Sequence, residues 1–117
     1  MAVQKRPAGK TTIAPEVLIS IAKLTTLSTP GVVRIASTPR EVTSWFKPGY
    51  TEGVIITVEN DTVFADLYVI LGSDVKVRDV CHLIQTNISR AIAESVGMEV
   101  GKVNVHVEDI DFSQTTA

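Results

Sequence analysis

The sequence predicts an α+β fold, a two-layer sandwich in which a small mixed or antiparallel sheet carries two amphipathic helices on one face. Residues 15–28 and 75–96 place apolar side chains at helical spacing. Residues 54–59, 63–71 and 102–109 alternate apolar and polar side chains, as half-buried strands do. Hydrophobic residues make up 44% of the 117-residue chain, which is enough for one core and one domain.

The first helix is expected from about Pro15 to Ser28. Proline suits the first helical turn because the N–H that it lacks would have no helical partner there. Glu16 complements the positive end of the helix dipole, and Pro30-Gly31 ends the helix. The expected core stripe consists of Val17, Leu18, Ile21, Ala22, Leu24 and Leu27.

A short strand is expected at residues 32–35, followed by a long connection over residues 36–53 with two prolines and two glycines. One helical turn is expected near residues 41–46. Connections of this length in compact domains tend to be functional or mobile.

Half of the six aromatic residues of the chain lie in this connection, as Trp45, Phe46 and Tyr50. Exposed aromatic side chains can anchor a partner or a lipid interface, which makes these three a candidate partner contact. The alternative is that they fold back and cap the end of the core.

Asn60-Asp61 provides turn chemistry for a β-hairpin between residues 54–59 and 63–71. The second helix is expected over about residues 75–96, with Asp74 as a candidate N-cap and Gly97 just beyond its end. Its expected core stripe consists of Val77, Val80, Cys81, Ile84, Ile88, Ala91, Ile92 and Val96.

The second face of the sheet is expected to be open and polar, with Asp66, Tyr68, Asn104, His106 and Glu108 exposed on it. A carboxylate near a histidine could support acid–base catalysis. No nucleophile, oxyanion donor or cofactor motif accompanies this pair in the sequence, and an antiparallel sheet commonly has one polar face. A solvated or protein-contact face is therefore expected.

The sequence offers no motif for catalysis or for a bound group. His82 and His106 lie on different elements, whereas a structural zinc site needs about four ligands. Phosphate-binding glycine motifs and the GXXG loop of a KH module are missing from the sequence. Cys81 has no second cysteine to pair with and is expected to be a buried, inert thiol. No catalytic residue, cofactor or metal is expected, and the chain is not expected to be an enzyme.

The net charge of −2 hides an asymmetry between the two parts of the chain. Residues 1–11 read as a flexible basic leader with a charge of +3, residues 12–112 as the domain, and residues 113–117 as a polar tail. An acidic body argues against nucleic-acid binding. Because no signal peptide or stretch of about 20 apolar residues is found, no direct membrane span is expected.

Several short motifs, in order, make the chain resemble the alkaline shock protein family of bacterial envelope stress-response proteins. The match covers about residues 10–112. The motifs are Ile13-Ala14-Pro15-Glu16-Val17-Leu18, Pro30-Gly31-Val32, Gly53-Val54, Ala65-Asp66-Leu67-Tyr68-Val69-Ile70, Ile84-Gln85-Thr86-Asn87-Ile88 and Val103-Asn104-Val105-His106-Val107.

The resemblance implies a non-enzymatic cytoplasmic protein that self-associates and lies at the inner membrane through a membrane-embedded partner protein. One departure is the connection over residues 37–53, which is usually glycine-rich in this family. The function expected is therefore protein–protein interaction in the envelope stress response. The alternative is a nucleic-acid or ribosome-associated module that uses the basic leader, and a small enzyme that uses the polar sheet face is the weakest of the three hypotheses.

Overall fold

The computed structural model describes residues 9, 12–37, 50–51 and 53–114. Most of the basic leader, the expected helical turn at 41–46, and the side chains of Trp45 and Phe46 lie outside these residues. Predictions that concern them stay predictions.

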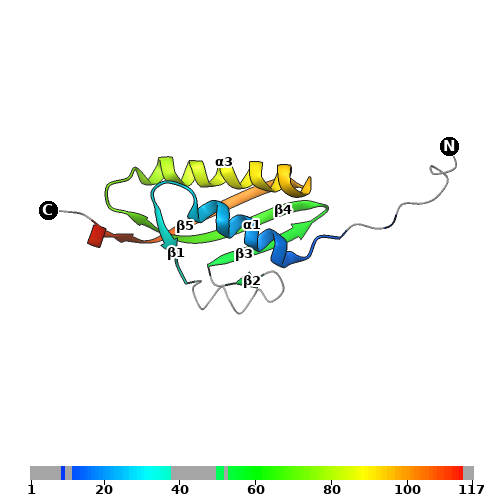
Figure 1. The fold of residues 1–117 in the computed structure, drawn as a ribbon, viewed down its shortest axis with the longest axis horizontal. Helices are drawn as coiled ribbons and strands as arrows, with labels where there is room; N and C mark the ends of the chain where they lie inside the picture. The colour runs from blue at the N-terminus through cyan, green and yellow to red at the C-terminus, as the bar shows by residue number, and fades with distance from the viewer. Residues whose placement is uncertain (1–8, 10–11, 38–49, 52, 115–117) are drawn as a thin grey trace.

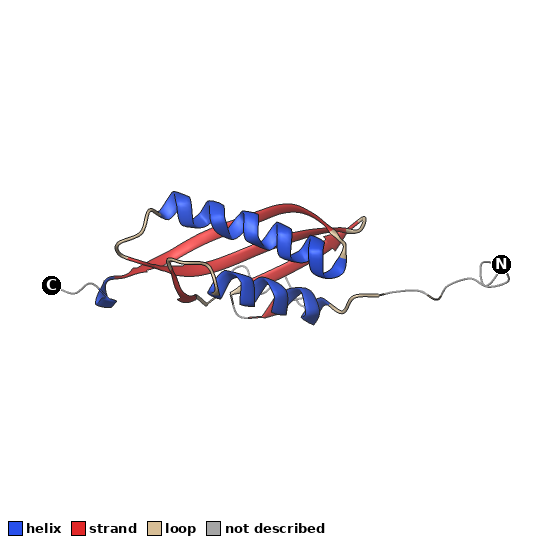
Figure 2. Ribbon diagram, turned by 45° about the horizontal axis from the view of Figure 1, so that its top comes forward, coloured by secondary structure: helices blue, strands red, loops and turns tan. Residues whose placement is uncertain are grey.

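The described residues form a two-layer α+β sandwich, which confirms the predicted fold class. One layer is a five-stranded sheet, and the two helices lie side by side on one of its faces (Figures 1 and 2). In chain order the elements are α1 (Pro15–Leu27), β1 (Val32–Ile35), β2 (Tyr50–Thr51), β3 (Val54–Glu59), β4 (Thr62–Gly72), α3 (Val77–Val96), β5 (Glu99–Asp111) and the 3-10 turn η2 (Phe112–Gln114).

The central strand of the sheet is β4, which is paired along both edges. On one side β5 runs parallel to it over nearly the whole length, so β4, α3 and β5 form a βαβ unit. On the other side β3 and β1 pair antiparallel with its first and second halves. The short β2, which was not predicted, pairs with the outer edge of β3.

Strands β1 and β3 meet end to end beside Tyr68 of β4. The Tyr68 N–H donates to the Gly53 carbonyl (2.9 Å), and the Ala36 N–H donates to the Tyr68 carbonyl (2.7 Å). Strands β1 and β3 therefore pair with β4 almost as one continuous strand would, and the connection between Ala36 and Gly53 interrupts them.

The hairpin predicted between β3 and β4 is confirmed. Asn60 and Asp61 both have positive φ angles, of 51° and 62°. These angles match a type I′ turn, whose twist suits two adjacent antiparallel strands.

The core lies between the sheet and the helices. The apolar row of β4 is fully buried, as predicted, together with the inward-facing residues of α3. In these two elements, the core residues with no exposed surface are Val63, Ala65, Leu67, Val69, Leu71, Ile84, Ile88 and Ile92.

The stripe predicted for α1 is partly wrong. Its buried residues are Leu18, Ile19, Ala22 and Thr26, whereas Val17, Leu24 and Leu27 are exposed. The helix carries apolar residues around most of its circumference, so the spacing alone did not identify the inward face.

The two ends of α3 differ in how well the sequence predicted them. Gly97 ends the helix in a left-handed conformation (φ 73°), as predicted. The N-cap is Lys76 rather than Asp74, and no side chain caps this end.

Gly53 is the position where the junction beside Tyr68 leaves no room for a side chain. Its φ is +82°, and a Cβ there would overlap the Ile35 side chain and the Ala36 carbonyl. We expect Gly53→Ala to lower the free energy of unfolding by roughly 2–5 kcal/mol, because the left-handed conformation and the overlap both add a cost.

Gly97→Ala is the matched control, measured in the same urea titration. It also has a positive φ, but no heavy atom lies within 4 Å of the added Cβ. Its expected cost is therefore only about 1–2 kcal/mol. Equal losses in the two variants would show that the close contact at Gly53 does not limit stability.

Candidate functional site

The polar cluster predicted on the open face of the sheet is brought together by the parallel pairing of β4 and β5. Asp66 lies opposite Asn104, and Tyr68 lies opposite His106. Alternation along each strand puts these four side chains on the face away from the helices.

One carboxylate oxygen organises this cluster. Asp66 Oδ1 accepts a hydrogen bond from Asn104 Nδ2 (3.2 Å) and lies 3.0 Å from His106 Nε2, which donates to it in the tautomer that carries its proton there. The His106 and Asp66 side chains remain 40% and 33% exposed. The arrangement is a partly solvated surface network rather than a closed pocket.

Tyr68 lies on this face but is not exposed, so the prediction of its exposure is wrong. Only 5% of its surface is accessible, because it packs with Ala36 and Ile55, and Ile70 lies against this group. The His106 ring stacks on the Tyr68 ring, with centroids 4.5 Å apart and planes 13° from parallel. The small second core under this face follows from the junction of β1 and β3.

The surroundings of Tyr68 raise the pKa of its hydroxyl. Burial is the largest cause, and the negative charges of Asp66 and Glu108 act in the same direction. The phenol therefore stays protonated at neutral pH and provides a ring surface for His106, not a base.

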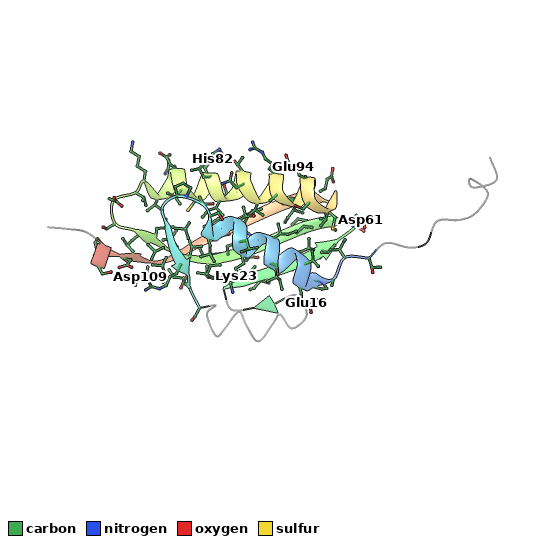
Figure 3. All side chains as sticks on the ribbon, viewed as in Figure 1. Glu16, Lys23, Asp61, His82, Glu94 and Asp109 are labelled. Atoms are coloured by element: carbon green, nitrogen blue, oxygen red, sulfur yellow. The ribbon has the colours of Figure 1, made fainter. Side chains whose placement is uncertain are left out.

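The described residues outside this cluster show no arrangement typical of a reactive site. None of their His, Cys, Asp and Glu side chains form a group of three or more that could hold a metal ion. Burial raises the pKa of the Cys81 thiol, which disfavours the reactive thiolate. His82 is exposed on the outer side of α3 (Figure 3), whereas His106 lies on β5 of the sheet.

Two grooves on the described surface lie away from the cluster. One is lined by α1, the hairpin turn and the end of α3, including Leu18, Asp61 and Met98. Another lies between Val32, Gly72 and Val75.

An apolar face of α1 that the helical spacing predicts to be buried lies exposed. Val17, Leu24 and Leu27 are 44%, 66% and 42% exposed, respectively. The signal for this face was the apolar composition of the whole helix, since a helix that is apolar on all sides usually has partners on all sides. We call these three residues the outer face of α1.

The predicted aromatic cluster cannot be assembled from the described residues. Trp45 and Phe46 lie outside them, and Tyr50 is described only as a backbone position of β2 opposite Ile55. The basic residues Lys5, Arg6 and Lys10 also lie outside, so the nucleic-acid hypothesis stays a prediction.

The described residues form a small α+β domain with two exposed faces. The outer face of α1 is apolar, and the open face of the sheet carries the polar cluster. A family model covers residues 3–112, nearly the whole chain, and its description is a cell envelope-related function. The chain belongs to this family, the alkaline shock protein 23 family.

Two curated relatives agree with this assignment. The uncharacterized protein Spy1535 of Streptococcus pyogenes serotype M6 is 32% identical over 108 residues, which is 92% of this chain and 83% of that protein. The uncharacterized protein YloU of Bacillus subtilis (strain 168) is 26% identical over 111 residues, which is 87% of this chain and 88% of that protein.

Solved structures share the fold at low sequence identity. A structure of the MamM CTD in a copper form has a TM-score of 0.51 and 14% identity, and covers 86% of this chain and 91% of that chain. Another MamM CTD structure has a TM-score of 0.50 and 13% identity, and covers 80% of this chain and 96% of that chain. This likeness concerns the fold alone.

Neither described helix has the length and apolar character that a bilayer span requires.

The raised pKa of Tyr68 predicts how stability depends on alkaline pH. The stabilisation from its protonated form is complete below the pKa of an unfolded tyrosine, about 10, and is lost as the pH rises through the folded-state pKa. The free energy of unfolding should therefore fall above about pH 10, and should fall less in Tyr68→Phe.

Urea unfolding at a series of pH values measures this difference. Both proteins should carry Cys81→Ser, because the raised pKa of that thiol acts in the same direction. Parallel pH profiles for the two proteins would contradict the assigned environment of Tyr68.

Proposed function

We propose that this chain is a non-enzymatic protein of the cell envelope stress response that acts through protein–protein interaction at the inner face of the membrane. It binds copies of itself and a membrane-embedded partner protein. The family's cell envelope-related function supports the setting, and the surfaces of the domain support the mode of action.

The observation that carries the proposal is the outer face of α1. Leu24 is two-thirds exposed at the middle of this face, with Val17 and Leu27 on either side of it along the helix. The opposite side of the same helix packs on the core through Leu18 and Ala22. The helix is therefore held rigidly while it presents large apolar side chains, a combination typical of partner-binding surfaces.

The geometry of the polar cluster supports a non-catalytic role. Asp66 Oδ1 is already engaged by His106 and Asn104, and the Tyr68 ring beneath is buried and protonated. A general base needs free access to a substrate proton, and a nucleophile needs an activated group beside it. The cluster instead orders the surface of two neighbouring strands.

Binding to native membrane vesicles from the producing bacterium tests the proposal. The wild-type chain should co-sediment with these vesicles and not with protein-free vesicles of the extracted lipids. Treating the vesicles with protease beforehand should abolish binding, because the partner is a membrane protein.

Leu24→Asp should reduce this binding by about tenfold or more, since a charge replaces an apolar anchor at the centre of the contact. Thr86→Asp is the matched control, because it places the same charge on the exposed side of α3. Both substitutions should leave stability within about 0.5 kcal/mol of wild type. Equal binding to protease-treated vesicles would show that the partner is not a protein. Full binding by Leu24→Asp would show that the outer face of α1 does not form the contact.

A further inference from the structure

The outer edge of β5 is a long strand edge. β5 has 13 residues, and among the described strands it pairs only with β4. An edge strand presents backbone N–H and C=O groups that can pair with another strand. Edges of this length are normally covered, shortened or protected by charge, so the residues of β5 decide whether it excludes a second strand or accepts one.

The apolar residues of β5 are arranged symmetrically about Val105. The register with β4 places five of them on the face toward the helices: Val100, Val103, Val105, Val107 and Ile110. Reading outward from Val105, the apolar residues come after two and after five positions in both directions. A strand with this pattern matches itself when a second copy runs antiparallel to it.

The irregularities of the strand have the same symmetry. One register shift falls between Val100 and Val103, and the other between Val107 and Asp109. They are nearly equidistant from Val105. Two copies paired antiparallel about Val105 would therefore place one irregular segment opposite the other, and the regular segment 103–107 opposite itself.

The charges in the irregular segments are complementary under the same pairing. Lys102 of one copy lies opposite Glu108 of the other, and the two-fold axis produces this pair twice. Both side chains are exposed, and no ion pair within the described residues involves them. Facing residues of opposite charge stabilise a strand pair, whereas like charges destabilise it.

Asn104 would lie opposite His106 on the open face, which is compatible with this register. Glu99 would lie opposite Asp111, and this pair of like charges at each end of the contact opposes the pairing, although Arg34 lies 3.4 Å from the Asp111 carboxylate and partly neutralises it. A shift of the pairing by one residue would put Val105 opposite His106. Residues opposite each other in a strand pair share one face of the sheet, whereas Val105 and His106 lie on different faces, so the match is specific to one register.

The apolar row of β5 is also less covered than that of β4. The inward residues of β4 have no exposed surface, whereas Val100, Val105, Val107 and Ile110 remain partly exposed at the sheet edge. A second strand beside β5 would bring its own apolar row and its own α3 alongside, because α3 packs over β5 (Figure 2). Pairing would thus bury apolar surface as well as backbone groups.

We propose that β5 pairs antiparallel with β5 of a second copy of this chain about a two-fold axis at Val105, joining the two sheets into one. The inference rests on the self-association in the proposed function and names the surface that performs it. The contact is isologous, so it closes at a dimer and leaves the outer face of α1 on each copy available for the membrane partner.

One side-chain contact with β5 is compatible with this pairing. The Gln85 amide of α3 donates to the Val103 carbonyl (3.0 Å). A carbonyl oxygen has two lone pairs and can accept a second hydrogen bond from the opposite strand.

Charge reversal at one position tests the proposal. In Lys102→Glu every Lys102–Glu108 pair of the dimer becomes a repulsive pair of carboxylates. We expect the dimer dissociation constant, measured by sedimentation equilibrium from micromolar to near-millimolar protein, to rise roughly tenfold. Glu108→Lys should weaken the dimer equally, and the double variant K102E/E108K should restore it.

Lys23→Glu is the control, because it reverses an exposed charge on α1, away from the β5 edge. It should leave the dissociation constant unchanged. Amide hydrogen exchange in residues 103–107 should slow as the protein concentration rises, and should not slow in Lys102→Glu. Mixing the two single variants should form a heterodimer in which both 102–108 pairs are attractive, so it should bind more tightly than either single variant binds itself, and about as tightly as the wild-type dimer.

The outcomes separate this inference from the proposed function. A protein that stays monomeric at near-millimolar concentration overturns both the β5 contact and self-association. A dimer that ignores the single reversals, or that the double variant fails to restore, overturns the β5 contact and leaves self-association standing. Membrane binding through α1 is measured separately and depends on neither result.

Discussion

The pairing of β4 along both of its edges is the constraint on which the rest of the structure depends. Its apolar row has no exposed surface, because β5 lies on one side, β3 and β1 lie on the other, and both helices cover it. Burial of such side chains contributes about 1.5–3 kcal/mol each before entropy is counted. The parallel pair of β4 and β5 also requires a crossover, which α3 provides, so the position of the longer helix follows from the same pairing.

The open face takes its character from one point on that strand. Where β1 and β3 meet beside Tyr68, Gly53 approaches Ala36 so closely that no Cβ fits, and the backbone hydrogen bonds of Tyr68 go to both segments. Tyr68 is consequently buried with Ile55, and His106 stacks over it while donating to Asp66. A face that could have been a wet array of polar groups instead has a small apolar base under an ordered polar network.

The apolar core of the domain is well covered, whereas two apolar surfaces at its periphery are not. α1 keeps large apolar side chains outside, and β5 keeps a strand edge with partly exposed valines. Such surfaces raise the free energy of the isolated monomer, and a partner that covers them lowers the free energy of the complex, which makes them candidates for specific binding. These two surfaces lie on different elements, so one can serve the second copy while the other serves a membrane partner.

The sequence by itself determined the elements and the layers. Alternation along β4 identified its core face, and the spacing in α3 identified its buried residues Val80, Ile84, Ile88 and Ile92, although Val77, which was also predicted to be in the core, is 42% exposed. Asn60-Asp61 and Gly97 marked the hairpin and the helix end, because these signals depend on local backbone geometry. Only the tertiary structure decided which side of α1 is buried, since a helix apolar on all sides carries no directional signal, and which strand lies beside β4, since strand order depends on contacts distant in sequence. The burial of Tyr68 and the position of β5 at the edge of the described strands were decided in the same way, by neighbours that no local pattern identifies.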